Sequence, residues 1–226
     1  MEYLERTISY LTTNLHAHDP KLFTRPHGLV PAFTTASPSP SPPPTIPMTS
    51  PTCGPSGSIM AVQYTQDGAD TFPTLTWTLP SSLDPERVKE YLLVIQDPDA
   101  PLPSPITHGV FYGIPPGKTA VAQEDVVETG RGNELSGGFR YGLNRRGTVY
   151  AGPRPLRGHG EHRYFFQLIA LGEGLDLGKM SKVATLEEIG REISVEGRML
   201  AWGGVDWCCG EEIGETWEWR VSCHHA

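Results

Sequence analysis

The sequence predicts a fold dominated by β-structure: an antiparallel β-sandwich with peripheral helices near the two ends of the chain. Its 226 residues include 25 glycines and 22 prolines, a composition that indicates many turns between short elements. The apolar segments in the middle of the chain have the length of strands. No helices of about 10–15 residues alternate with them, so a parallel sheet built from strand–helix–strand units is disfavoured.

Five segments carry the strand signal. Leu75, Trp77 and Leu79 alternate with threonines, as expected for a strand with one buried face. The run from Tyr91 to Ile95 is continuously apolar, which is typical of a buried strand. In chain order, the predicted strands cover residues 58–64, 74–79, 90–96, 109–114 and 164–171.

Two other segments show helical spacing. The first is a stripe of apolar residues at intervals of four, three and four, made by Leu4, Ile8, Leu11 and Leu15. This spacing places the four side chains on one face of a helix. The second segment begins with Thr185 and Glu188, the pattern of a capping box. The apolar spacing that follows predicts a helix over residues 185–200.

These elements divide the chain into four predicted parts. They are an N-terminal helix (1–18), a Pro/Ser-rich extended segment (19–50), the sandwich domain (51–205) and a Trp/Cys-rich tail (206–226). The extended segment is expected to be a spacer, because proline fixes φ and removes backbone donors; a ligand for a proline-binding domain is the alternative. The aromatic cluster of the tail is expected to pack in the core, with a lid or a homodimer contact as alternatives.

Charge and motifs exclude several classes of protein. The net charge of −8 argues against nucleic-acid binding, because an acidic chain gains nothing from counterion release. No segment approaches the ~20 apolar residues of a transmembrane helix. The four cysteines form a poor disulfide framework, so we expect free thiols and a cytoplasmic protein. Phosphate-binding, dinucleotide and nucleophile-elbow motifs are absent, as is local metal-ligand spacing, so no cofactor and no metal are predicted.

The first chemistry-bearing segment is Asp97-Pro98-Asp99-Ala100-Pro101, at the end of a predicted buried strand. Side-chain alternation would send both aspartates to one face of the strand. Two carboxylates on a rigid turn can bind hydroxyl groups, ammonium groups or a metal ion. The structural alternative is a turn in which an aspartate accepts hydrogen bonds from its own backbone.

The second segment contributes histidines at the start of a strand. His162 opens the predicted strand 164–171, as His108 opens 109–114, and neutral imidazole can both donate and accept hydrogen bonds. Their matching positions predict one shared site with the aspartates. His159 lies between two glycines, where simple exposure is an equal alternative. For Arg163, a structural ion pair with a carboxylate is favoured over binding of a ligand anion.

These residues resemble the two signature regions of the phosphatidylethanolamine-binding protein family. The first comprises Asp97-Pro98-Asp99-Ala100-Pro101 and His108; the second runs Gly152-Pro153-x-Pro155, Gly158-His159-Gly160-x-His162-Arg163-Tyr164. Pro73-x-Leu75-x-Trp77 and Tyr141-Gly142-x-Asn144 agree as well, so the resemblance covers roughly residues 50–205. The Pro-Leu-x-Gly-His-Gly sequence is most similar to fungal members.

The resemblance implies a two-sheet antiparallel Greek-key β-sandwich with a small anion-binding pocket at one end. The pocket would bind a phosphate- or carboxylate-bearing small molecule, and a protein partner is a further possibility. Carried over by matching motif, its ligand-binding residues would be Asp97, Asp99, Pro101, His108, Gly152, Pro153, His162 and Tyr164.

Two functions follow from the resemblance. The first is a binding module for a small anion. The second is an accessory enzyme of fungal secondary metabolism, since some fungal members belong to maleidride clusters and are thought to assist dimerising cyclisation. Asp97, His108 and His162 would then be catalytic, with one of the histidines as the base. Gly109 stands where many relatives carry Trp or Phe, and we expect it to widen the mouth of the pocket.

Overall fold

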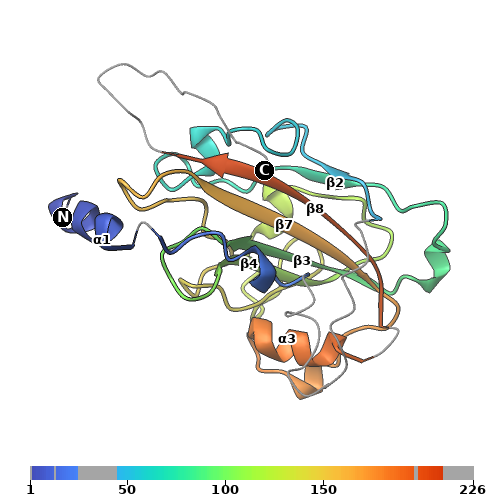
Figure 1. The fold of residues 1–226 in the computed structure, drawn as a ribbon. Helices are drawn as coiled ribbons and strands as arrows, with labels where there is room; N and C mark the ends of the chain where they lie inside the picture. Colours follow the sequence, from blue (N-terminus) through green and yellow to red (C-terminus); the bar gives the residue numbers. More distant parts are fainter. Residues whose placement is uncertain (1, 13, 25–44, 196–197, 211–226) are drawn as a thin grey trace.

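The fold is known from a computed structural model that describes residues 2–12, 14–24, 45–195 and 198–210. Two antiparallel sheets form a sandwich, which confirms the predicted fold class (Figure 1). The three-stranded sheet has the order β1-β2-β5 and the five-stranded sheet the order β6-β4-β3-β7-β8. The strands are β1 (Met48–Thr49), β2 (Leu75–Trp77), β3 (Glu90–Asp97), β4 (Ile106–Ile114), β5 (Ala120–Val121), β6 (Arg140–Tyr141), β7 (His162–Leu171) and β8 (Met199–Cys209).

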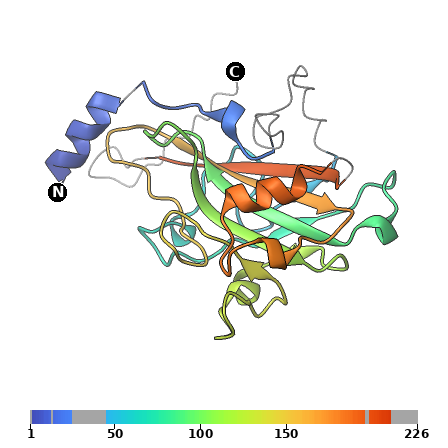
Figure 2. The same cartoon turned by 90° about the horizontal axis from the view of Figure 1, so that it is seen from below.

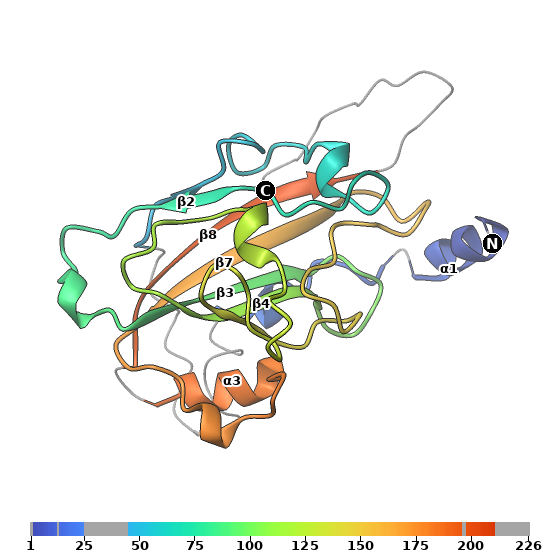
Figure 3. The same ribbon diagram turned by 180° about the vertical axis from the view of Figure 1, so that it is seen from behind.

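Two α-helices and five 3₁₀ turns complete the described fold. The α-helices are α1 (Glu2–Thr12) and α3 (Leu186–Ile193). The 3₁₀ turns are η1 (Asp19–Lys21), η2 (Val62–Tyr64), η3 (Pro85–Arg87), η4 (Gln123–Val126) and η5 (Leu177–Lys179). Helix α3 covers the outer face of the five-stranded sheet, whereas α1 lies at one end of the molecule (Figures 2 and 3).

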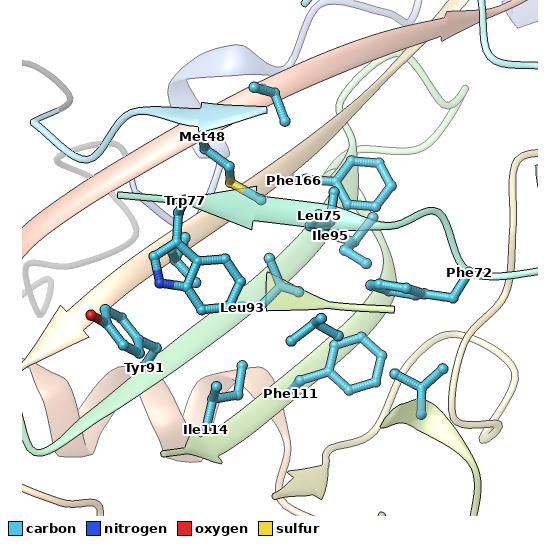
Figure 4. Packing of buried hydrophobic residues seen from close by; sticks show 14 of the residues in the cluster. Met48, Phe72, Leu75, Trp77, Tyr91, Leu93, Ile95, Phe111, Ile114 and Phe166 are labelled. Carbon is cyan, nitrogen blue, oxygen red and sulfur yellow. The ribbon is translucent and has the colours of Figure 1, made fainter. Parts of the chain in front are cut away.

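The main hydrophobic core lies between the two sheets. Trp77 of the small sheet packs edge-on against Tyr91 of the large one, with ring centroids 5.4 Å apart (Figure 4). Phe72 contacts Phe111 and Phe166 in the same way, at 5.5 and 6.4 Å. These aromatic contacts fix the two sheets face to face.

A second core explains why β3 is continuously apolar from Tyr91 to Ile95. Tyr91, Leu93 and Ile95 point into the main core, whereas Leu92 and Val94 pack on the opposite face of the sheet. There they join residues of α3, whose capping box is formed as predicted. A strand buried on both faces cannot alternate with polar residues. The predicted strands at 90–96, 109–114 and 164–171 are confirmed as the centre of this sheet.

The predicted helix over 185–200 is wrong in its second half. Helix α3 ends at Ile193, and the chain from Met199 onward forms β8, which pairs along the whole of β7. The predicted domain boundary at residue 205 therefore falls inside a strand. Trp202 and Trp207 are both buried, one in each core, so core packing is confirmed for these two tryptophans. Residues 211–226, and with them the proposed dimer contact, lie outside the described residues.

Two other expectations are changed, and a third falls outside the described residues. Residues 62–64 of the predicted first strand form η2, and Ile59 makes only an isolated bridge to Cys208. Cys53 and Cys209 are free, but Cys208 is disulfide-bonded, so the prediction of free thiols is wrong for this residue. The Pro/Ser-rich run, residues 37–44, lies outside the described part of the chain. No described helix is long and apolar enough to span a bilayer.

Candidate functional site

A cavity of about 390 Å³ opens at the end of the five-stranded sheet where β3 ends and β7 begins. This volume lies within the ~300–1,000 Å³ range of small-molecule sites. Three elements of the sheet contribute to it, because β4 also begins at this edge. The lining residues are Ile8, Gln66, Asp97, Ala100, Pro101, Leu102, Ile106, Thr107, His108, Arg145, Arg146, Ala151, Arg154, Leu156 and His162.

The structure brings four of the eight predicted site residues to this cavity: Asp97, Pro101, His108 and His162. The other four, Asp99, Gly152, Pro153 and Tyr164, are not among the lining residues. Each has a structural position next to the cavity. The two signature segments therefore meet in space, but only part of each faces the cavity.

Asp99 is held in an ion pair on the far side of its turn. Both of its carboxylate oxygens accept from Arg163, at 2.8 Å from Nε and 2.7 Å from Nη2. The backbone amides of Arg163 and Ala17 also donate to it, at 2.9 and 3.0 Å. Burial alone would raise the pKa of Asp99, but the hydrogen bonds from Arg163 outweigh burial and lower it. The structural interpretation of Arg163 is confirmed, and the two aspartates do not share one face.

The lowered pKa of Asp99 predicts an acid-sensitive contribution to stability. Its ordinary pKa is 3.8, so the contribution is complete above that pH and is lost as pH falls through the lowered value. We expect Asp99→Asn to cost about 1–3 kcal/mol at pH 7 and less at pH 2. Urea unfolding at the two pH values measures this difference. Glu187→Gln, which removes an exposed ion pair, is the control; equal losses at both pH values would contradict the assignment.

Asp97, by contrast, begins a chain of hydrogen bonds that ends at α1. Its Oδ1 accepts from the amide of Asp99 at 2.8 Å, and its Oδ2 lies 2.8 Å from His162 Nδ1. His162 Nε2 lies 2.8 Å from His159 Nδ1. His159 Nε2 in turn lies 3.1 Å from the carbonyl oxygen of Thr12. His159 is thus a partner of the buried pair rather than an exposed turn residue.

The number of hydrogens in this chain can be counted. The Thr12 carbonyl only accepts, so His159 Nε2 carries a hydrogen. The hydrogen bond between His159 and His162 requires a hydrogen as well, and so does the one between His162 and Asp97. Three hydrogens are needed, whereas two neutral imidazoles supply only two. The additional proton balances the charge of the Asp97 carboxylate, which is only 2% exposed. The hydrogen-bonded chain of Asp97, His162 and His159 therefore holds one proton more than a carboxylate and two neutral imidazoles would. We call this additional proton the stored proton.

His108, unlike the histidines of this hydrogen-bonded chain, has a ring nitrogen that is free to accept a hydrogen bond. Its Nδ1 lies 2.6 Å from the carbonyl oxygen of Ala151, so Nδ1 carries the hydrogen and Nε2 keeps its lone pair. Within the described residues, Nε2 is buried and has no hydrogen-bond partner. Burial lowers the pKa of His108, and nearby Arg145 acts in the same direction, against the opposing charge of Asp97. His108 is therefore a neutral acceptor, able to bind a proton from a ligand.

Gly152 and Pro153 shape the loop that closes the cavity. The amide of Gly152 donates to Asp70 Oδ1 at 2.8 Å, and a Cβ at this position would collide with that oxygen and with the Tyr64 carbonyl. The carbonyl of Pro153 accepts from the amide of Gln66 at 3.0 Å. Both residues thus anchor the loop to η2 and its following turn. Only glycine allows this close approach.

Tyr164 lies behind the cavity wall. Its ring meets His108 edge-on, with centroids 5.0 Å apart. Burial raises the pKa of Tyr164 well above its ordinary value, so the hydroxyl stays protonated. Tyr164 thus supports the ring of His108.

Three arginines that the sequence analysis did not select line the cavity: Arg145, Arg146 and Arg154. Within the described residues, no carboxylate pairs with Arg145 or Arg146. Their turn is shaped by buried Asn144, whose side chain donates to the His108 carbonyl at 3.0 Å and accepts from the Arg146 amide at 3.0 Å. Two unpaired cations at a cavity favour an anionic ligand. The motif Tyr141-Gly142-x-Asn144 was the only sequence signal near Arg145 and Arg146.

The expectation for Gly109 is wrong. A Cβ at this position would meet the side chains of Phe111 and Ile95, at 2.9 and 3.1 Å, and both belong to the main core. The pairing of β4 with β3 shifts register at this point, where Gly109 is opposite Ile95 and Thr107 is opposite Gln96, so side chains do not simply alternate between His108 and Gly109. The glycine makes room for core packing and does not widen the mouth. Within the described ranges, no group of three metal-ligating side chains is placed to hold an ion.

An antiparallel β-sandwich with a cavity at one end, lined by histidines, an aspartate and arginines, defines the class of protein. Solved structures share the fold: a putative phosphatidylethanolamine-binding protein homolog of Chlamydia trachomatis (TM-score 0.58, 22% identity) and E. coli YbcL, a member of the mammalian PEBP family (0.59, 19%). Each match covers 74% of this chain and 99% of the other. The family model for phosphatidylethanolamine-binding protein matches residues 49–202. The chain belongs to this family, as the sequence resemblance indicated.

Two fungal relatives are more similar in sequence. Both are named phomoidride biosynthesis cluster protein B, one from Talaromyces stipitatus and one from a strain designated Fungal sp.. Identity is 42% over 159 residues for the first and 41% over 158 for the second. Each match covers 69% of this chain, and the matched parts span 63% and 73% of the relatives. This chain is therefore a fungal-type member of the family.

Proposed function

We propose that this protein binds a small molecule bearing a carboxylate or phosphate group in the cavity at the end of β3. The observation that carries the proposal is the pair of arginines, Arg145 and Arg146, which line the cavity and have no ion-pair partner among the described residues. The net charge of the chain is −8, so this positive edge is a local feature rather than a consequence of composition. An anion bound there would gain charge-assisted hydrogen bonds from the guanidinium groups.

The charge state of the rest of the cavity supports the same ligand. Asp97 is the only carboxylate among the lining residues, and the proton shared with His162 and His159 neutralises it. An incoming anion therefore meets no uncompensated negative charge. Gln66 and Thr107 add neutral polar side chains to the wall.

Substitution of the arginines tests the proposal. We expect the double variant Arg145→Gln/Arg146→Gln to bind maleate or inorganic phosphate at least about tenfold more weakly, since a hydrogen bond to a charged group contributes roughly 1.5–3 kcal/mol. Isothermal titration calorimetry with each anion measures the change. Arg191→Gln on α3, which loses an exposed ion pair on the outer face of the five-stranded sheet, should bind like the wild type. Binding unaffected by the double substitution would refute the proposal.

A second candidate function is acid–base catalysis on the bound anion, as an accessory step in secondary metabolism. It is favoured by the contrast between His108, whose Nε2 is an open acceptor, and the Asp97–His162–His159 chain, which stores a proton. His108 could remove a proton from carbon while the stored proton neutralises an oxygen of the same molecule. The names of the two fungal relatives place them in a biosynthesis cluster and support this direction.

Three further expectations stay predictions: a protein partner, a homodimer through residues 206–226, and a cytoplasmic location. The part of this chain that matches the Talaromyces relative spans 63% of that protein, so nothing about the whole relative is transferred directly. The disulfide at Cys208 argues against a strongly reducing compartment. Measuring the mass of the purified protein before and after reduction would show whether the disulfide at Cys208 is present.

A further inference from the structure

Helix α1 is held to the protein mainly by polar contacts. The Ser9 hydroxyl, in a residue only 1% exposed, donates to the carbonyl of Arg157 at 2.6 Å. Two residues of the apolar stripe, Leu4 and Leu11, are 64% and 74% exposed, although the sequence spacing had indicated a face that packs. Figures 1 and 3 show the helix at the end of the molecule, outside both sheets. An element with so little apolar burial undocks at a low cost in free energy.

One of the polar contacts of α1 is the last link of the hydrogen-bonded chain of the site. His159 Nε2 lies 3.1 Å from the carbonyl oxygen of Thr12, the last residue of α1. A carbonyl oxygen only accepts, so this contact needs a hydrogen on Nε2. When α1 is displaced, water takes the place of the carbonyl, and water can donate as well as accept. The third hydrogen of the chain is therefore required only while α1 is docked.

Two neutral imidazoles satisfy the remaining links when α1 is displaced. His162 then donates from Nδ1 to Asp97, and His159 donates from Nδ1 to His162 Nε2. Bringing the Thr12 carbonyl back to this arrangement would set two lone pairs against each other unless a further proton binds. The docked state thus holds one proton more than the undocked state. By linkage, proton binding favours docking and docking favours proton binding to the same extent.

We propose that α1 is a proton-controlled cover of the cavity, docked while the stored proton is present and undocking when that proton is lost. Ile8 of α1 lines the cavity, so undocking removes part of the cavity wall. Delivery of the stored proton to a bound molecule has the same effect on the Thr12 contact as a rise in pH. The proton link follows from the hydrogen-bonded chain alone, whereas its use in ligand exchange rests on the proposed function.

Other charged groups on α1 and on the connector that follows it, residues 14–24, contribute to docking. Glu5 of α1 pairs with Arg154 at 3.6 Å, and Asp19 of the connector pairs with Arg163 at 2.7 Å. Both are pairs of opposite charge, so neither requires an additional proton. The other titratable or charged groups of this region are His16, His18, Asp67 and Arg157.

The strands next to His162 contribute neutral groups. Cys209 of β8 lies opposite His162, and burial raises the pKa of its thiol to about 12. His108 of β4 is neutral because burial lowers its pKa. Asp97 is thus the charge that the stored proton balances.

The variant Asp97→Asn removes the link without removing the contacts. Its amide can donate to His162 Nδ1, so that His162 donates from Nε2 to His159 and His159 donates from Nε2 to Thr12. Two neutral imidazoles then satisfy the whole chain while α1 is docked. Docking in this variant should not depend on pH.

Hydrogen exchange of the α1 backbone amides tests the proposal on the full chain without a ligand. A helix of 11 residues is marginal on its own in water, so its amides exchange when it undocks. We compare about pH 5.5 with about pH 8.5, which spans most of the range in which imidazole ordinarily changes charge. After correction for intrinsic exchange, protection of wild-type α1 should fall at least about tenfold, the effect of one hydrogen bond to a charged group.

The variants decide between the possible origins of this change. Protection of α1 in Asp97→Asn should change less than about twofold, whereas Glu5→Gln should keep the wild-type pH dependence. Wild-type protection that is independent of pH, or an equal change in Asp97→Asn, would overturn the proposal. His159→Ala gives a second comparison, because it removes the link to Thr12 and should abolish the pH dependence as well. The amides of β3 in the same samples show whether each variant is folded. Since no ligand is present, failure here leaves the proposed anion binding to its own titration.

Discussion

Replacing Asp97 by alanine is expected to lower the free energy of unfolding by about 3–5 kcal/mol, because it leaves a stored proton without its counter-charge in a buried site. The alanine would also leave the amide of Asp99 without its acceptor. Asp97→Asn should cost much less, since its carbonyl can accept from Asp99 and its amide can donate to a neutral His162. Urea unfolding of both variants measures the difference.

The same pair of variants separates binding from catalysis. In Asp97→Asn the stored proton is gone, but Arg145 and Arg146 are unchanged, so maleate should still bind. Any catalysed incorporation of deuterium from D₂O into the methyl groups of dimethylmaleic anhydride should be lost, as in His108→Ala. Similar unfolding energies for Asp97→Asn and Asp97→Ala would contradict the shared proton. Catalysed exchange that survives both Asp97→Asn and His108→Ala would reject the acid–base function.

Trp207→Ala is the second large expected effect, a loss of about 3–5 kcal/mol. Trp207 is fully buried, packs edge-on against Phe166 with centroids 5.0 Å apart, and donates from Nε1 to the Gly54 carbonyl at 3.2 Å. Its removal leaves a large cavity between the two sheets. Urea unfolding followed by far-UV circular dichroism measures the loss.

The matched control for Trp207 lies in the same strand. Trp202 is 7% exposed and belongs to the smaller core on the outer face. Trp202→Phe keeps an aromatic ring there and should cost less than about 1.5 kcal/mol. A loss below about 1 kcal/mol for Trp207→Ala would mean that the strand does not contribute to the core as described.

The prediction of strands succeeded where burial follows from a local pattern. The runs in β3, β4 and β7 are apolar because both faces of the sheet are covered, and such runs are visible in one sequence. Residues 194–200 were misassigned for a related reason. The apolar spacing after α3 fits a helix, but β8 pairs with a strand about forty residues earlier, and that pairing has no local signal.

The candidate site was predicted in part. Asp97, Pro101, His108 and His162 were selected from motifs and do line the cavity. Asp99 was grouped with Asp97 by alternation, but the proline turn sends it to Arg163 instead. Gly109 was expected to widen the mouth because many relatives carry Trp or Phe there, but a Cβ at this position would meet Phe111 and Ile95 of the main core.

The sequence by itself determined the family, the β-sandwich and the residue types available for chemistry, because these depend on composition, periodicity and local motifs. Only the tertiary structure decided which partner each residue meets. Thr12 and His159 are separated by 147 positions, yet their contact completes the hydrogen-bond chain that requires the stored proton. Arg145, Arg146 and Ile8 come from distant segments and face one cavity. Such contacts arise when the whole chain packs, so no local pattern encodes them.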